Sequence, residues 1–264
     1  MKSKIALLIG MLVLSAATSA AAKTVLISDV DDTVKLAYAF GSAYGAQYFK
    51  DTKSRFTGMS EVYDLITHDN LDVKVYYVSL APTYLMERLH GKFLRNGAFP
   101  IGTYIGRTNL PSETHKLETI RSILRSERPS RVILVGDDGQ ADAAVYRQVS
   151  AEPEFAGIIF DQFIHIVSSL KEANGQNKVQ GAQVGFVTSY EFALELNARK
   201  LIQDRSMKYV SDHILPEILI EAPGSDENEE TNQVAFPYFM DCKAINWRWN
   251  VPGLNEKVRG FCKF

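Results

Sequence analysis

The stretch TVLISDVDDTVK, residues 24–35, decides the fold of this chain. Its first five residues form a short apolar run without alternation, which is typical of a β-strand buried on both faces of a parallel sheet. Three carboxylates follow at once, those of Asp29, Asp31 and Asp32. Ligands of open α/β sheets bind beyond the carboxyl ends of the strands, so this acidic turn is the first candidate for a functional site.

Strand-like and helix-like segments alternate through residue 160. We expect further strands at 73–79, 99–105, 131–136 and 157–160. Apolar residues at helical spacing predict helices near 59–66, 82–94, 112–124 and 141–149. This alternation predicts an α/β fold, a Rossmann-like parallel sheet with helices on both faces. Residues 33–57 lack a clear period and are interpreted as a small insertion, or flap, after the first strand.

The first 22 residues have the layout of a secretory signal peptide. Lys2 and Lys4 precede the apolar run 5–14, and small residues ending in Ala20-Ala21-Ala22 offer a cleavage site. Cleavage predicts an exported protein, periplasmic or secreted, with no stable membrane insertion; an uncleaved anchor is the alternative. We therefore divide the chain into the signal peptide (1–22), a main α/β domain (23–169) and a C-terminal extension (170–264).

The extension is expected to be helical and loop-like, and its sequence assigns it no role. Residues 172–185 are interpreted as a connector, and Thr188-x-x-Glu191 is a capping box that opens a helix. The apolar positions expected on that helix are Phe192, Leu194, Leu196, Leu201 and Ile202. The last 35 residues are expected to be loop. Cys242 and Cys262 are a candidate disulfide in an oxidising compartment, with two unpaired thiols as the alternative.

Composition excludes several classes of protein. With 46% hydrophobic and 23% charged residues in 264, the chain is globular rather than disordered. Its net charge is −2, and −4 once the two leader lysines are removed, so no nucleic-acid partner is expected. Five histidines never recur at helical spacing, which argues against a histidine metal site and predicts surface or core roles for them.

A second acidic group follows the strand expected at 131–136. It comprises Asp137, Asp138 and Asp142. Carboxylates from two strand ends are what a hard cation requires, and Mg²⁺ favours such oxygens together with phosphate. Ser79 ends the second strand and can donate to a phosphoryl oxygen, and Lys116, early in its helix, can neutralise phosphate charge. Taken singly, each could equally be an ordinary strand-end hydroxyl or a solvated lysine.

Acid, hydroxyl, lysine and acid at four successive loops resemble the haloacid dehalogenase superfamily of phosphohydrolases. More closely, residues 24–168 resemble the phosphatidate phosphatase catalytic-domain family. The matching motifs are SDVDDTVK at 28–35, TGM at 57–59, YVSLAP at 77–82, FPIG at 99–102 with Arg107, HK at 115–116 and LVGDDGQAD at 134–142. The chain departs from the family at Ala81, Thr83 and Asp138, where serine, tryptophan and serine are usual.

The resemblance implies a mechanism through an aspartyl-phosphate. Asp29 would be the nucleophile, and Asp31 would protonate the leaving group and then activate water. Ser79 and Lys116 would hold the phosphoryl oxygens. Mg²⁺ would bind Asp29, the backbone carbonyl of Asp31, and Asp137, with Asp142 favoured over Asp138 to complete the shell.

Three further residues receive weaker roles from the resemblance. Thr33 would order the acidic loop, and Lys35 and Arg107 are candidates for substrate contact or for plain surface roles. The chain is thus expected to be an exported Mg²⁺-dependent phosphomonoesterase, with phosphatidate as the candidate substrate. Aromatic residues of the flap could form an apolar approach surface: Tyr38, Phe40, Tyr44, Tyr48 and Phe49.

Two alternatives stay open. One is a phosphatase of small soluble phosphomonoesters, because the changes at Ala81 and Thr83 alter the wall beside the site. The other is a module that binds a phosphoryl ligand without turnover. A receiver domain uses similar residues, but its acceptor aspartate follows a middle strand, whereas the acidic pair here follows the first.

Overall fold

The computed structural model describes residues 23–37, 54–108, 112–167, 179–221, 233–236 and 248–261. The predicted signal peptide, the aromatic residues of the flap, and Cys242 and Cys262 lie outside these ranges. Within the described part of the chain, no helix is both long and apolar enough to span a bilayer.

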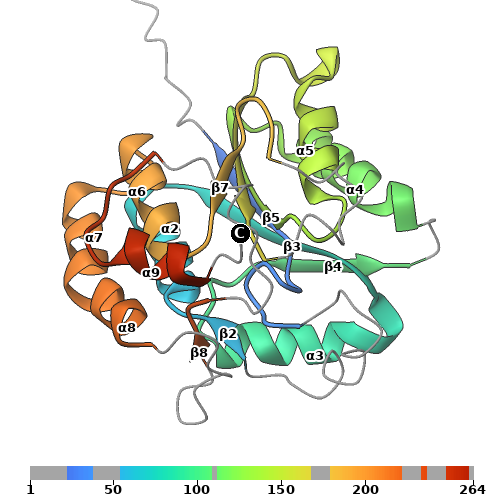
Figure 1. Cartoon of the computed structure of the whole chain (residues 1–264). Coiled ribbons are helices and arrows are strands. Elements are labelled where there is room, and N and C mark those ends of the chain that lie inside the picture. The colour runs from blue at the N-terminus through green and yellow to red at the C-terminus, as the bar shows by residue number, and fades with distance from the viewer. Residues whose placement is uncertain are drawn as a thin grey trace, which may run out of the picture.

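A six-stranded, wholly parallel sheet forms the centre of the molecule, in the order β4-β3-β1-β5-β6-β7 (Figure 1). Its strands are β1 (Thr24–Ser28), β3 (Val73–Pro82), β4 (Thr103–Arg107), β5 (Arg131–Asp137), β6 (Ile159–His165) and β7 (Val184–Phe186). All five residues of β1 are buried, as its unbroken apolar run predicted. The predicted parallel α/β fold is confirmed.

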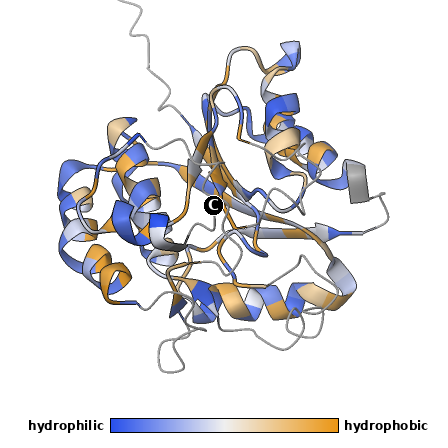
Figure 2. Cartoon of the chain, viewed as in Figure 1, coloured by the Kyte–Doolittle hydropathy of each residue, from blue (hydrophilic) through white to orange (hydrophobic). Residues whose placement is uncertain are grey.

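Helices cover both faces of this sheet. They are α2 (Met59–Asp69), α3 (Thr83–Asn96), α4 (Ser112–Glu127), α5 (Asp142–Ser150), α6 (Ser189–Ala198), α7 (Asp204–Tyr209), α8 (Leu215–Ile220) and α9 (Leu254–Phe261), with a 3₁₀ turn at Pro153–Phe155 and a π-helical segment at Val210–Ile214. Figure 1 shows α4 and α5 on one side of the sheet and α2 and α6 on the other. Figure 2 shows hydrophobic residues concentrated along the central strands, while the helices alternate between hydrophobic and hydrophilic positions.

Several predicted boundaries were wrong. The strand expected at 99–105 begins only at Thr103, because residues 97–102 form the turn that leaves α3. The strand expected at 157–160 starts at Ile159 and runs on to His165, pairing with β5 throughout.

The C-terminal extension also differs from its prediction. The capping box of Thr188 and Glu191 is present, but the helix ends at Ala198 because Lys200 adopts a positive φ of 59°. Leu201 and Ile202 are therefore buried beyond the helix rather than on it. The predicted connector ends earlier, since 184–186 form β7, and the predicted loop at the C-terminus contains α9.

Two segments of the extension pair with the main domain. β7 hydrogen-bonds to β6 and makes the sixth strand of the central sheet. A two-residue strand, β8 (Gln233–Val234), pairs with β2 (Arg55–Phe56) next to the loop that follows β1. Residues on both sides of residue 169 thus share one sheet, and the proposed division there stays a prediction.

Candidate active site

The loop after β1 is a compact turn that presents Asp29 and Asp31 at the carboxyl edge of the sheet. The Asp29 N–H donates to Val135 O on β5 at 2.9 Å, so β1 still pairs with its neighbour at this residue. The chain then turns back: the N–H groups of Val34 and Lys35 both donate to Val30 O. Asp32 stands at the bend with φ +58°, a conformation that aspartate tolerates better than most residues.

Lys116, on α4, reaches into the acidic site and joins two carboxylates. Its Nζ lies 2.9 Å from Asp29 Oδ1 and 2.5 Å from Asp142 Oδ1, and all three side chains are buried. Burial alone would lower the pKa of Lys116, but the carboxylates of Asp142 and Asp29 outweigh it and raise that pKa. The lysine is therefore a permanent cation beside Asp29.

Asp137 and Asp142 complete a group that we call the acidic cluster, together with Asp29. One ligand oxygen from each lies within 4.8 Å of the others. Asp137 ends β5, and its Oδ1 accepts the N–H groups of Gly139 and Gln140 at 2.7 and 3.1 Å. Asp142 begins α5, and its Oδ2 accepts the Asp137 N–H at 3.2 Å. Backbone hydrogen bonds thus fix both carboxylates.

The acidic cluster fits a divalent cation. When all three carboxylates are ionised, Lys116 offsets one charge and leaves two in excess. Burial raises the pKa of Asp29 to about 7, helped by the charges of Asp142 and Asp31. Burial and Asp142 likewise raise the pKa of Asp137 well above its usual range. A bound divalent cation would relieve this repulsion, and oxygen ligands suit hard cations.

Asp138, the alternative ligand, points elsewhere. Its Oδ1 accepts the Val167 N–H at 2.9 Å, and its own N–H donates to His165 O at 3.0 Å. It does not belong to the group of carboxylates within 4.8 Å of one another. The structure therefore brings Asp142, and not Asp138, to Asp29 and Asp137.

Asp31 lies beside the acidic cluster with its own set of partners. Ser79 Oγ and Lys35 Nζ each lie 3.5 Å from its carboxylate oxygens. His90 Nε2 lies closer, 3.1 Å from Asp31 Oδ1. Lys35 is fully buried in this loop, so its predicted alternative of a surface role was wrong.

Sequence reasoning assigned His90 only to surface or core and missed its contact with Asp31. A signal was present, because His90 lies on the buried stripe of α3 with Met86, Phe93 and Leu94. A titratable side chain on an apolar helix face needs a polar partner in the core.

Thr33 and Arg107 take different positions relative to the acidic cluster. Thr33 Oγ1 donates to Asp29 Oδ2 at 3.2 Å and lies 3.5 Å from Asp137 Oδ2, while its ordering role stays a prediction. Arg107 ends β4, half-buried, and its Nε donates to Leu80 O at 3.1 Å. It contacts the end of β3 next to Ser79 rather than the carboxylates.

A second histidine connects the acidic loop with the extension. The ring nitrogens of His165 lie 3.0 Å from Thr33 O and 3.0 Å from Val187 O. The ring also stacks on Phe186, with centroids 4.8 Å apart and planes inclined by 7°. His165 therefore braces the backbone of the residue whose hydroxyl holds Asp29.

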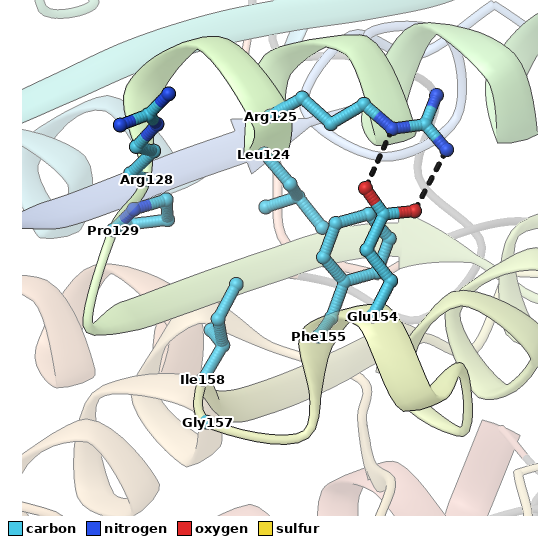
Figure 3. A pocket seen from close by; sticks show the side chains of 8 residues that line it. All are labelled: Leu124, Arg125, Arg128, Pro129, Glu154, Phe155, Gly157 and Ile158. Carbon is cyan, nitrogen blue, oxygen red and sulfur yellow. Dashed lines mark hydrogen bonds and ion pairs between the residues drawn. The ribbon is translucent and has the colours of Figure 1, made fainter.

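A surface pocket of about 510 Å³ lies away from these residues (Figure 3). It is lined by Leu124, Arg125, Arg128, Pro129, Glu154, Phe155, Gly157 and Ile158. These residues precede β5 and β6, so the pocket lies at the amino ends of those strands. Arg125 and Glu154 form a two-point ion pair on its rim. The pocket is at the opposite edge of the sheet and takes no part in the acidic site.

Comparison with known proteins identifies the family. The catalytic-domain family of phosphatidate phosphatase APP1 matches residues 24–160, a range that contains the acidic cluster, Asp31, Ser79 and Lys116. A Saccharomyces cerevisiae protein named phosphatidate phosphatase APP1 is 29% identical over 131 residues, covering 46% of this chain and 22% of that protein. An uncharacterized Schizosaccharomyces pombe protein is 27% identical over 142 residues, covering 48% of this chain and 22% of its own length.

The matched part of this chain thus spans about a fifth of these curated relatives. The matched family is one of phosphoric monoester hydrolases, in agreement with the carboxylates and lysine gathered at the sheet edge. Because the match covers more than half of the sequence, the chain belongs to the phosphatidate phosphatase APP1 catalytic-domain family.

Proposed function

We propose that this chain is an exported, Mg²⁺-dependent phosphomonoesterase that works through an aspartyl-phosphate on Asp29. The observation that carries the proposal is the buried acidic cluster with Lys116 between two of its members. A nucleophile at the end of β1, a fixed cation beside it, and excess carboxylate charge for a metal are the parts that phosphoryl transfer needs.

Each side chain has a defined task in this mechanism. Asp29 attacks phosphorus in line: a bond from Asp29 to phosphorus forms while the bond to the leaving oxygen breaks, and Asp31 gives that oxygen its proton. Asp31 then takes a proton from water, whose oxygen displaces Asp29 from phosphorus. Lys116 and Ser79 hold the equatorial phosphoryl oxygens.

The same geometry supports a proposed set of metal ligands. Asp29, Asp137 and Asp142 would hold Mg²⁺, together with the backbone carbonyl of Asp31. When bound, the metal neutralises charge on the phosphoryl group and on the carboxylates around it. Thr33 keeps Asp29 from rotating away, since its hydroxyl bonds the carboxylate oxygen that Lys116 does not.

A matched pair of substitutions in one loop tests the chemistry. Asp29→Asn should abolish phosphate release from any phosphomonoester, because an amide cannot form the acyl phosphate. Asp32→Asn is the control: Asp32 Oδ1 accepts the Ala37 N–H at 2.9 Å, a bond that an amide oxygen can keep, and asparagine tolerates the positive φ.

The control should retain activity close to wild type, and a chelator should abolish activity in both active proteins. Half or more of wild-type activity in Asp29→Asn would overturn the nucleophile assignment. Full activity in excess chelator would remove the metal from the mechanism. Binding of phosphate without turnover in the wild type would favour the non-catalytic module.

We further propose phosphatidate as the substrate, as in the name of the yeast relative. Tyr84 and Leu85, in the first turn of α3, which directly follows the carboxyl end of β3, are 88% and 43% exposed. Exposed apolar side chains at the edge of the sheet where the strands end suit an enzyme that works on a lipid surface.

The double substitution Tyr84→Ser/Leu85→Ser should lower the rate on phosphatidate vesicles severalfold and leave the rate on glycerol phosphate unchanged. The control is Ile101→Ser. Ile101 is fully exposed and lies near the amino end of β4, so this substitution should change neither rate. Comparable rates of the wild type on soluble esters, with none on dispersed phosphatidate, would replace the lipid by a small soluble substrate.

A further inference from the structure

His90 occupies a place in the structure that a core residue alone does not need. It lies in the middle of α3, between Met86 and Phe93 on the buried face, and its side chain is fully buried. An apolar ring would fill the same buried position without needing hydrogen-bond partners, so the presence of an imidazole there suggests that its nitrogens make specific contacts. Both nitrogens do have partners, and one of those partners is Asp31.

The two contacts of His90 form a continuous chain. Nε2 lies 3.1 Å from Asp31 Oδ1, and Nδ1 lies 2.9 Å from the hydroxyl of Tyr104 on β4. Asp31 Oδ1 can accept a hydrogen bond both when the carboxyl is ionised and when its other oxygen carries the proton. With Nε2–H donating to Asp31 Oδ1, Nδ1 accepts from the tyrosine O–H. These two contacts hold the imidazole ring in one orientation.

Tyr104 is itself suited to hold the ring. Its hydroxyl stays protonated at neutral pH, because burial raises its pKa. Its ring meets the His90 ring edge to face, with centroids 5.4 Å apart and planes inclined by 71°. Hydrogen bond and ring contact together fix where Nε2 points, which is toward Asp31.

His90 makes a closer contact with the Asp31 carboxyl than Lys35 or Ser79 does. The distances are 3.1 Å for His90 and 3.5 Å for each of the other two. Ser79 lies on β3, but its contact is longer and it has a task of its own at the phosphoryl group, and Lys35 lies on the same short loop as Asp31. His90 fixes Asp31 relative to the sheet, because it comes from a helix packed on β3 and β4.

We propose that His90, held by Tyr104, is the positioning residue that aims the carboxyl of Asp31 at the leaving-group oxygen. The inference rests on the proposed function, in which Asp31 carries the proton. His90 itself neither gives nor takes that proton. The proton passes from Asp31 to the departing alkoxide as the bond from phosphorus to that oxygen breaks. In the second step, Asp31 takes a proton from the attacking water.

Leaving-group dependence separates this role from a merely structural one. An alkoxide is a poor leaving group and needs its proton in the transition state, whereas dinitrophenolate leaves without one. A misplaced Asp31 therefore slows glycerol phosphate hydrolysis and spares dinitrophenyl phosphate. A variant that is simply less well folded loses the same factor on both substrates.

The test compares kcat on glycerol phosphate and dinitrophenyl phosphate at saturating Mg²⁺ for four proteins: wild type, His90→Phe, His90→Gln and Phe93→Leu. His90→Phe keeps the volume and removes both nitrogens, and should lose roughly 10- to 100-fold on glycerol phosphate but less than about threefold on dinitrophenyl phosphate. His90→Gln retains a donor at the reach of Nε2 and should restore most of the loss.

Phe93→Leu is the matched control, because Phe93 is buried one turn further along the same face of α3 and packs on Phe99. It should lower both rates by the same small factor. Tyr104→Phe keeps the ring contact and removes only the hydroxyl, so it should show the selective loss in weaker form, and it keeps the proposal testable if His90→Phe does not fold.

Further comparisons separate a failure of the role of His90 from a failure of the proposed role of Asp31. With Asp31→Asn already in place, His90→Phe should cause no additional loss on glycerol phosphate, since it acts through Asp31. Suppose that His90→Phe and Tyr104→Phe lose the same factor on both substrates, while Asp31→Asn loses activity only on glycerol phosphate. This result would overturn the role of His90 and leave the role of Asp31 standing. An Asp31→Asn protein without leaving-group dependence would overturn the assignment of Asp31 and this inference with it.

Discussion

Gly136→Ala should displace one carboxylate of the acidic cluster, that of Asp142, without removing any charged group. A Cβ added at Gly136 would lie 2.5 Å from Asp142 Oδ2 and 2.6 Å from Asp142 Cβ. Ordinary van der Waals contact begins at 3.4 Å, so the carboxylate oxygen must retreat by about 0.9 Å. It cannot do so freely, because Asp142 is tied to the Asp137 N–H and to Lys116 Nζ.

The size of the effect follows from that displacement. Overpacking of a buried site costs about 1 to 3 kcal/mol in the free energy of unfolding. A metal ligand moved by this distance should weaken activation by Mg²⁺ roughly 10- to 100-fold. The control is Gly157→Ala: a Cβ at Gly157 meets no atom within 4 Å, so stability should change by less than about 0.5 kcal/mol.

Two measurements check the prediction. Urea unfolding gives the change in stability, and initial rates against Mg²⁺ concentration on a soluble phosphomonoester give the half-saturating concentration. A Gly136→Ala protein with wild-type stability would refute the packing argument. A destabilised Gly136→Ala protein that needs no more Mg²⁺ than wild type would show that Asp142 is not a ligand.

Three further outcomes are expected. Lys116→Met should abolish turnover and lower the free energy of unfolding by about 3 to 5 kcal/mol in urea, because it strands buried carboxylates; a loss below about 1 kcal/mol would contradict this. Burial lowers the pKa of His165 to about 4, so the folded protein binds fewer protons than the unfolded chain below pH 6.5. The free energy of unfolding should therefore fall from about pH 6.5 to pH 4, by up to about 1.4 kcal/mol per pH unit, and His165→Phe should lack this slope; rising stability in that interval would mean a ring protonated between two carbonyls. If export removes residues 1–22 as predicted, mass spectrometry of the secreted fraction should place the N-terminus at Lys23. Denaturing thiol titration of that protein should detect no free thiol; two reactive thiols per chain would exclude the pair Cys242–Cys262.

The centre of the fold and the acidic residues could be predicted because both leave local signals. Buried parallel strands are continuous apolar runs, and β1 and β5 are each followed at once by acidic residues. Since the carboxyl ends of parallel strands meet at one edge, Asp29 and Asp137 had to approach each other once β1 and β5 were neighbours. The sequence left open whether Asp142 or Asp138 joins the acidic cluster. The structure decides this through the turn after β5, which directs Asp142 toward Asp137 and Asp138 toward Val167.

The remaining parts of the site depend on contacts between residues far apart in the sequence, which carry no local period. His90 and Asp31 are separated by 59 positions, and His165 and Thr33 by 132. β7 has only three residues, too few for a recognisable pattern, and it is a strand because β6 offers it a free edge. These elements follow from tertiary packing, which overrides local propensity.

The family match ends at residue 160, but residues beyond it also support the loop that carries Asp29. The backbone of the acidic loop is held from the extension side at two points. One is His165, which lies between Thr33 O and Val187 O. The other is the ladder in which the Phe56 N–H donates to Val34 O and the Thr57 N–H donates to Val234 O. Because the proposed nucleophile must be held within a fraction of an ångström for in-line attack, the proposed mechanism depends on residues beyond the matched range. The extension, for which the sequence offered no role, thus acts as the outer support of the acidic loop.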